Sequence, residues 1–323
     1  MRALITGITG FAGSYLAEHL LAQPGVEVFG WKRWNSPLDN LAAVLDRLTL
    51  ADVDIADPYA VRQGLEEVRP DRIFHLAARS YVPASFRAPH DAIRVNVLGT
   101  LALLEAVRHS GLDPLVHICS SSEVYGQVLE ADLPIHEGTP LRPQSPYGVS
   151  KVAEDLVSYQ YYVSYGLRIV RSRAFTHVGP RGRDLVVMPA FARQIAELEL
   201  GFRKEQVIRV GNLGSVRTFA DVRDIAAAYW LLTEHGTVGE VYNIAGRYTC
   251  TIGEMLDTLL ALSDVRPRIE VDAQLLRPSD VTRQVADIGK FERATGWRPQ
   301  VPFDRTIREV LDYWRERVAA RAR

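Results

Sequence analysis

The fold of this protein is decided by residues 6–13, which read Thr6-Gly7-Ile8-Thr9-Gly10-Phe11-Ala12-Gly13. They end the apolar run Ala3–Thr6 and open a segment with apolar residues at helical spacing, Ser14–Ala22. Glycines at this spacing permit a tight turn, close approach of the backbone to a pyrophosphate, and close packing of the helix on the sheet. The N–H groups at the start of that helix are free to bind the anion. Strand, turn and helix stand in the required order, so this stretch predicts a dinucleotide-binding unit.

Short β-branched runs alternate with helical segments over the first half of the chain. Such alternation is typical of a parallel sheet with helices on both faces. We therefore predict an α/β fold, a doubly wound parallel sheet of the Rossmann type. The predicted strands are Ala3–Thr6, Val26–Trp31, Leu48–Val53, Arg72–Leu76, Leu115–Cys119 and Leu167–Arg173, and the predicted helices are Ser14–Ala22, Pro58–Val68, Ala92–Ser110 and Pro146–Tyr165.

The pattern changes after residue 175, and the chain of 323 residues is longer than one hydrophobic core usually serves. We expect residues 1–175 and 219–246 to form the cofactor-binding domain. Residues 176–218 and 247–323 are expected to form a smaller C-terminal α/β lobe that binds the substrate. Further elements are predicted at Met188–Leu200, Asp224–Glu234, Glu240–Ile244, Met255–Leu262 after a capping box at Thr251–Glu254, and Arg305–Val318.

The composition excludes several classes of protein. A net charge of -1 gives no overall field that attracts nucleic acid, and no apolar run approaches the roughly 20 residues that span a bilayer. The two cysteines, Cys119 and Cys250, lie far apart and without metal-ligand spacing, so we expect no disulfide framework and no metal site. We expect a cytoplasmic protein that binds neither nucleic acid nor membrane.

The end of the second predicted strand indicates which dinucleotide is bound. NAD sites usually carry an acidic residue here that accepts from the ribose 2′-hydroxyl. This chain instead has Lys32 and Arg33 and no acidic residue. A guanidinium binds a 2′-phosphate in bidentate fashion. The sequence therefore favours NADP(H), with two solvated surface cations as the alternative.

Tyr147 and Lys151 stand four residues apart at the start of a predicted helix, which places them on one face. A free tyrosine has a pKa of about 10, and lowering it to about 7 takes roughly 4 kcal/mol of preferential phenolate stabilisation. The ammonium of Lys151 and an oxidised nicotinamide ring are expected to supply that energy together. Tyr147 is therefore a candidate general base.

A second group of polar residues, Ser120-Ser121-Ser122-Glu123, directly follows the fifth predicted strand. Ligands of open α/β sheets bind beyond the carboxyl ends of the strands. We therefore predict that Ser121 and Glu123 lie beside Tyr147 and Lys151 in a catalytic site; the alternative for the serines is a polar turn.

Together these motifs resemble those of the extended short-chain dehydrogenase/reductases. Within that group the chain is similar to the GDP-mannose 4,6-dehydratases and the related GDP-4-keto-6-deoxymannose reductases. The resemblance runs nearly end to end and rests on the glycine turn, Leu76-Ala77-Ala78, Ser121, Ser145-Pro146-Tyr147-Gly148 with Lys151, Val210-Gly211-Asn212-Leu213, Val216-Arg217, Ala228-Tyr229-Trp230-Leu231 and Leu276-Arg277-Pro278-Ser279-Asp280.

The resemblance implies a 4,6-dehydratase in which Tyr147 deprotonates the sugar O4 and Glu123 deprotonates C5. Ser121 would hold O4, and Lys151 would bind the nicotinamide ribose. The chain departs from the dehydratase pattern by serine at position 121, by Thr176-His177 in place of Asn-His, and by a shortened segment after the second strand. The reductase, or another nucleotide-sugar epimerase or dehydratase, remains the alternative.

The resemblance also implies a set of binding residues and an assembly. The substrate, with a GDP-sugar favoured, would contact Thr176, Arg217, Arg277 and Asp280. Helices at Ala92–Ser110 and Pro146–Tyr165 would pair in a homodimer or homotetramer. The expected NADP-binding residues are Gly7, Gly10, Phe11, Ala12, Gly13, Arg33, Asp54, Ile55, Leu76, Ala77, Ala78, Tyr147, Lys151 and His177.

Overall fold

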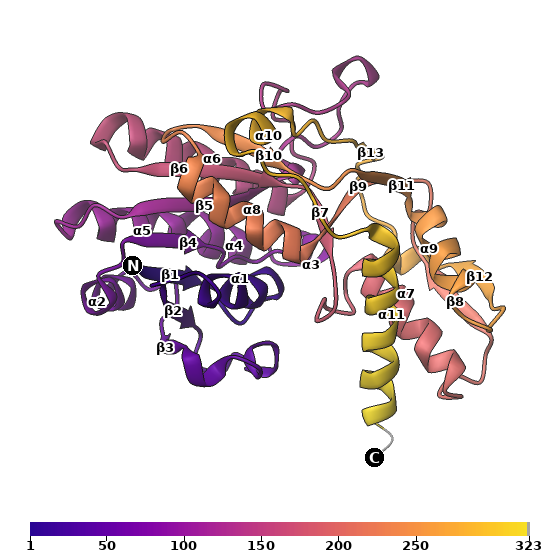
Figure 1. The fold of residues 1–323 in the computed structure, drawn as a ribbon. Coiled ribbons are helices and arrows are strands. Elements are labelled where there is room, and N and C mark those ends of the chain that lie inside the picture. Colours follow the sequence, from indigo (N-terminus) through magenta and orange to yellow (C-terminus); the bar gives the residue numbers. More distant parts are fainter. Residues whose placement is uncertain (322–323) are drawn as a thin grey trace.

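The computed structural model describes residues 1–321 and is built on a seven-stranded sheet in the order β10-β6-β5-β4-β1-β2-β3 (Figure 1). All neighbouring strands are parallel. The predicted doubly wound α/β sheet is thereby confirmed. The strands are β1 (Arg2–Thr6), β2 (Glu27–Lys32), β3 (Thr49–Asp52), β4 (Arg72–His75), β5 (Leu115–Ser121), β6 (Ile169–Ala174) and β10 (Val241–Ile244).

Helices cover both faces of this sheet, because its central strands are apolar on both sides and must be buried twice. On one face, α1 (Phe11–Leu21) packs beside α8 (Val222–His235) and shares a core with the sheet. On the other face lie α2 (Pro58–Val68), α5 (Gly99–His109) and α6 (Pro146–Tyr165). The helix predicted at Pro146–Tyr165 is confirmed at both ends, where the Ser145 hydroxyl caps Gly148 N–H and Gly166 takes a left-handed conformation.

The helix predicted at Ala92–Ser110 is not one regular α-helix. The chain forms a short α4 (Pro89–Ala92), then the π-helical η3 (Ile93–Leu98), then α5. The widened turn contains Asn96, which is fully buried. Its side chain accepts from Arg79 N–H at 2.7 Å and donates to Ser150 Oγ at 2.9 Å. These hydrogen bonds join residues that lie far apart in the sequence. The helical spacing of apolar residues over 92–110 therefore did not predict the π-helical turn.

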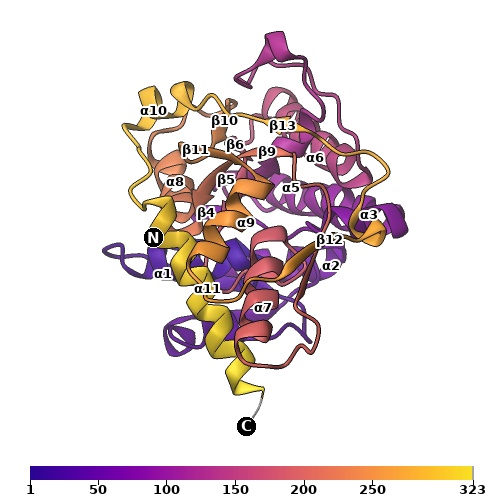
Figure 2. The same cartoon turned by 90° about the vertical axis from the view of Figure 1, so that its right-hand side faces the viewer.

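The second lobe has its own apolar core, formed by three helices that pack against small sheets (Figure 2). The helices are α7 (Val187–Glu199), α9 (Ile252–Ala261), which begins with the predicted capping box, and α11 (Phe303–Ala320). The small sheets contain β7 (Thr176–Val178), β8 (Val207–Val210), β9 (Val216–Asp221), β11 (Tyr248–Thr251), β12 (Arg268–Val271) and β13 (Arg283–Gln284).

The remaining helical elements are short. They are α3 (Val82–Arg87), α10 (Gly289–Thr295) and the 3₁₀ turns η1 (Asp39–Leu41), η2 (Leu45–Arg47), η4 (Ser122–Val124), η5 (Glu130–Asp132) and η6 (Ala273–Leu275).

None of the helices between residues 1 and 321 is both long and apolar enough to cross a membrane.

Candidate active site

The glycine turn between β1 and α1 leaves no room for larger side chains. Gly7 has a φ of 73°, and a Cβ there would lie 2.9 Å from Ala77 Cα. A Cβ at Gly13 would lie 2.5 Å from the Gly7 carbonyl oxygen. At Gly10 a Cβ would meet only that same oxygen within 4 Å, so the outer side of the turn is open. The turn therefore fits a pyrophosphate, which would approach Gly10 and the N-terminus of α1.

Residues after β4 lie against this turn through a buried polar network. Thr6 Oγ1 accepts from Ala77 N–H at 3.1 Å and contacts His75 Nδ1 at 2.8 Å. The segment Leu76-Ala77-Ala78 is thereby held beside Gly7 at the carboxyl edge of the sheet.

The two cations at the end of β2, Lys32 and Arg33, have different surroundings. Lys32 forms an ion pair with Asp52 of β3, whereas Arg33 is exposed and has no ion-pair partner within residues 1–321. Asp54 is exposed as well, but Ile55 is buried in the core against Gly99. Of the two cations Arg33 is therefore the accessible one, and the side chain of Ile55 is turned into the core.

The catalytic candidates come together at the junction of β5 and α6. Ser121 ends β5, and its hydroxyl accepts from Glu123 N–H at 3.2 Å. Tyr147 lies in the first turn of α6, where its N–H donates to Ser85 Oγ at 3.1 Å. Lys151 lies one turn later and donates to the carbonyl oxygen of Cys119, in β5, at 2.7 Å. The predicted proximity of Ser121, Tyr147 and Lys151 is therefore present in the fold.

The protein groups around Tyr147 do not by themselves lower its pKa. Burial raises the pKa of this phenol to about 12, and the charge of Lys151 and a hydrogen bond with Ser121 oppose that rise only in part. Tyr147 is 7% exposed and Lys151 3% exposed, which explains the strong effect of burial.

Glu123 faces a group of charged residues from the second lobe. Burial raises the pKa of its carboxyl, while the charges of Arg277 and Arg217 lower it. Arg217, in β9, is 8% exposed and lies 3.9 Å from Asp280. Three of the residues predicted to bind substrate are thus gathered beside Glu123.

Two of these second-lobe residues, Arg217 and Asp280, form hydrogen bonds within the protein that the sequence did not predict. Arg217 donates to the carbonyl oxygens of Val281 at 2.6 Å and Val216 at 2.9 Å. Asp280 accepts from Asn212 Nδ2 at 2.7 Å and from Ser215 Oγ at 3.1 Å through one carboxylate oxygen. Arg277 lies on the exposed loop before β13. Arg277 is therefore the more accessible cation for a diphosphate.

The remaining candidates, Thr176 and His177, lie in the half-buried β7. The ring of His177 is parallel to that of Phe11, with ring centroids 5.9 Å apart. His177 Nδ1 contacts the carbonyl oxygen of Phe175 at 3.0 Å, and burial lowers the pKa of its imidazole. The start of the second lobe is thus packed on the glycine turn.

Sequence reasoning missed two buried polar residues that position α6. Asn96 connects η3 to Ser150, as described above. Glu154 accepts from Lys151 Nζ at 2.7 Å, and its side chain is 1% exposed. The spacing of Lys151 and Glu154 on one helix face was a signal for this pair, but nothing in the sequence showed that the face is buried.

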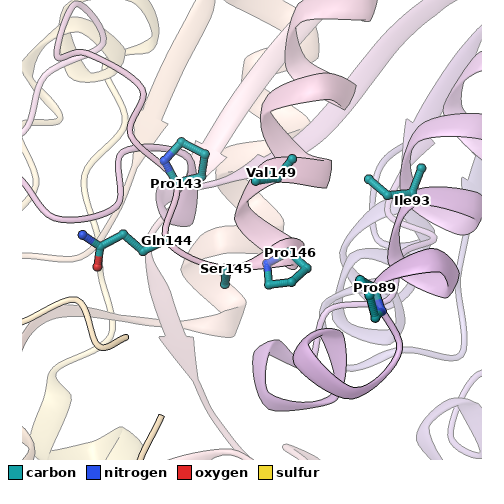
Figure 3. Close-up of a pocket in the computed structure, with 7 residues that line it drawn as sticks. All are labelled: Pro89, Ile93, Pro143, Gln144, Ser145, Pro146 and Val149. Atoms are coloured by element: carbon teal, nitrogen blue, oxygen red, sulfur yellow. The ribbon is translucent and has the colours of Figure 1, made fainter. Parts of the chain in front are cut away.

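An apolar groove lies between the start of α6 and the α4–η3 segment (Figure 3). Its lining comes from α4, η3, the loop before α6 and the first turn of α6, and it includes none of the four catalytic candidates. The lining residues are Pro89, Ile93, Pro143, Gln144, Ser145, Pro146 and Val149.

The family of the chain follows from comparison with known sequences. The family model described as GDP-mannose 4,6 dehydratase matches residues 4–310. The chain belongs to this family. GDP-6-deoxy-D-mannose reductase from Pseudomonas aeruginosa is 33% identical over 317 residues, which cover 98% of this chain and 98% of the relative.

Solved structures agree with this assignment and confirm the extended short-chain dehydrogenase/reductase class. The structure of RMD from Pseudomonas aeruginosa complexed with NADPH has a TM-score of 0.85 at 32% identity, with 98% of this chain and 99% of that chain covered. DesIV, a dTDP-glucose 4,6-dehydratase from Streptomyces venezuelae with NAD bound, has a TM-score of 0.88 at 31% identity, with 99% and 98% covered. The family member described here therefore has the architecture of nucleotide-sugar enzymes.

Proposed function

We propose that this family member is an NADP-dependent nucleotide-sugar 4,6-dehydratase that acts on GDP-mannose. The observation that carries the proposal is Glu123, a half-buried carboxyl that follows Ser121 by two residues at the end of β5. Elimination of water needs a second acid–base group beside the tyrosine, whereas reduction of a ketone does not. Burial raises the pKa of the Glu123 carboxyl above its usual range, which makes its carboxylate a stronger base for proton removal.

The side chains of the site divide the reaction between them. A nicotinamide bound at the glycine turn would supply the hydride chemistry, as acceptor from C4 and donor to C6. Tyr147 removes the proton of O4, which the Ser121 hydroxyl holds. Glu123 removes the acidified C5 proton and delivers it to the C6 hydroxyl, which leaves as water. When C6 is reduced, C5 regains a proton, and the proton that Tyr147 took from O4 balances it. The net change is loss of one water with no net oxidation or reduction.

The choice of NADP rests on the groups after β2. Arg33 is exposed and unpaired among residues 1–321, and the strand ends without a carboxylate that would repel a 2′-phosphate. The related structure with NADPH supports the choice, while the one with NAD shows that the fold also accepts the other cofactor.

The first test is to incubate the purified protein with GDP-mannose and NADP+, without a reductant, and to measure the mass of the sugar nucleotide. We expect the loss of one water. The Glu123→Gln variant should still oxidise C4, visible as a single-turnover rise in reduced-nicotinamide absorbance, but should not eliminate water. The Tyr147→Phe variant should bind NADP+ like the parent and lose turnover by about 100-fold or more.

A second candidate is reduction of the 4-keto-6-deoxy sugar with NADPH. It is favoured by the Pseudomonas aeruginosa reductase, which this chain matches over 98% of both lengths, and by the shortened segment after β2. An unchanged GDP-mannose together with NADPH oxidation by the 4-keto-6-deoxy sugar would replace the dehydratase proposal with this one. In that case Glu123→Gln should keep most of its turnover.

We also propose that the protein forms a homodimer through α6 and the η3–α5 segment. Apolar side chains are exposed along this face although α6 is buried on its other side, and the groove of Figure 3 continues it. Sedimentation at several concentrations should give a dimer mass, and Leu156→Glu should shift it toward the monomer. The exposed apolar residues are Ile93, Leu98, Val149, Leu156, Tyr159, Val163 and Tyr165.

A further inference from the structure

The ammonium of Lys151 forms two hydrogen bonds within the protein besides its expected interactions with the nicotinamide ribose and Tyr147. It donates to the Cys119 carbonyl oxygen and to Glu154 Oε2, each at 2.7 Å. An ammonium has three N–H donors, so one remains for a ligand or for Tyr147. Tyr147, Lys151 and Glu154 follow one another at helical spacing on one face of α6, with Lys151 between the other two. The charge of Lys151 therefore acts on both Tyr147 and Glu154.

Glu154 has an unusual environment for a carboxyl. Its side chain is 1% exposed, and its second oxygen, Oε1, has no hydrogen-bond partner among residues 1–321. A buried carboxylate is normally held by several donors, because its desolvation is costly. Burial raises the pKa of Glu154 to about 7, although the charge of Lys151 opposes the rise. This carboxyl therefore exchanges its proton close to neutral pH.

The other titratable groups packed around this pair do not change charge in the same range. Burial lowers the pKa of His75, from β4, and of His117, from β5, to about 3, so both imidazoles stay neutral. Burial raises the pKa of Cys119 and of Tyr229, which lies on α8, so both stay protonated. Asp155, the remaining carboxyl, is held by two arginines of β6, Arg171 and Arg173.

We propose that Glu154 is a positioning residue that controls, by gaining and losing a proton, how much of the Lys151 charge acts on Tyr147. The ionised carboxyl holds Lys151 and neutralises part of its charge. The protonated carboxyl releases it, and the phenolate of Tyr147 is then better stabilised. Protonation of Glu154 stabilises the phenolate of Tyr147 whether this tyrosine takes a proton from the substrate or gives one to it. The proposal rests on the proposed function only in taking Tyr147 as the proton-transferring group.

The test is a titration of Tyr147 itself, in protein saturated with NADP+. Tyrosinate absorbance is measured against pH, and the curve of the matching Tyr147→Phe protein is subtracted to isolate this one side chain. In Glu154→Gln the midpoint should fall by roughly one pH unit, since a nearby negative charge has been removed. Glu154→Asp keeps the charge with a looser contact, so its midpoint should lie between the two. The pH profile of turnover should shift the same way.

A control removes a paired carboxylate elsewhere: Glu199→Gln, which breaks the pair with Arg315 in the second lobe, should leave the Tyr147 midpoint unchanged. An unchanged midpoint in both Glu154 variants, with a loss of stability only, would overturn the proposal and leave Glu154 a structural residue. If Glu154→Gln does not fold, the Asp variant decides alone. Because the titration needs no turnover, it gives an answer even where GDP-mannose proves not to be the substrate.

Discussion

The imidazole of His177 lies parallel to the ring of Phe11, with an interplanar angle of 5° and a centroid separation of 5.9 Å. Phe11 is the first residue of α1 and lies within the glycine-rich stretch, and His177 lies in β7 at the start of the second lobe. The stacked pair therefore joins the two ends of the expected cofactor site, which are 166 residues apart in the sequence.

Replacement of His177 by alanine should weaken NADP+ binding by about 3- to 10-fold. The stacked ring restrains Phe11, and an aromatic pair contributes about 0.5–1.5 kcal/mol. Fluorescence titration with NADP+ measures the change, with His235→Ala, at the exposed end of α8, as the control. Equal affinities in the two variants would show that the pair has no part in cofactor binding.

Arg33→Ala should lower the affinity for NADP+ by about 10- to 100-fold and leave the affinity for NAD+ nearly unchanged. A hydrogen bond to a charged group contributes about 1.5–3 kcal/mol, and only NADP+ carries the 2′-phosphate. Isothermal titration with both cofactors measures the two affinities. Arg62→Ala, on the exposed face of α2, should change neither. A parallel loss for both cofactors would contradict the proposed role of Arg33.

Asp155→Ala should lower the free energy of unfolding by about 3–5 kcal/mol. The carboxylate is fully buried between Arg171, at 2.6 Å, and Arg173, at 2.8 Å, and its removal leaves two buried guanidinium groups without their counter-ion. Urea unfolding measures the loss. Glu66→Gln breaks an exposed pair with Arg62 and should cost less than about 1 kcal/mol. A similar small cost for both variants would refute the argument from burial.

Stability should fall as the pH is lowered from 6.5 toward 3, in part because of His75. Burial lowers the pKa of this imidazole from 6.5 to about 3. Between these values the unfolded chain binds a proton that the folded protein excludes, so each such histidine removes about 1.4 kcal/mol per pH unit. His75→Gln should reduce the slope of unfolding free energy against pH by that amount. A slope equal to that of the parent would show that His75 is protonated in the folded state.

Much of the fold could be predicted from local sequence. Periodicity alone identified α6 from Pro146 to Tyr165, and the glycine turn identified the βα unit at its entrance. These patterns are readable because each arises within one element and its immediate neighbours. The same logic brought Ser121, Tyr147 and Lys151 to one edge of the sheet, since parallel strands end at the same side.

The charges inside the site could not be predicted in this way. Nothing in the sequence showed that Glu154 would be buried with Lys151, that Asn96 would require a π-helical turn, or that Asp280 would bond to Asn212. Each of these depends on which faces of distant elements are packed together.

The sequence by itself determined the alternation of strands and helices in the first half of the chain, the glycine turn and the residue types of the candidate site. Only the tertiary structure decided how acidic those residues are. A pKa depends on desolvation and on charges within a few ångströms, and both are set by contacts between residues far apart in the chain. Tyr147 is the clearest case: the sequence predicted that Lys151 and an oxidised nicotinamide together lower its pKa, whereas nothing in the sequence showed that burial in the folded protein raises it.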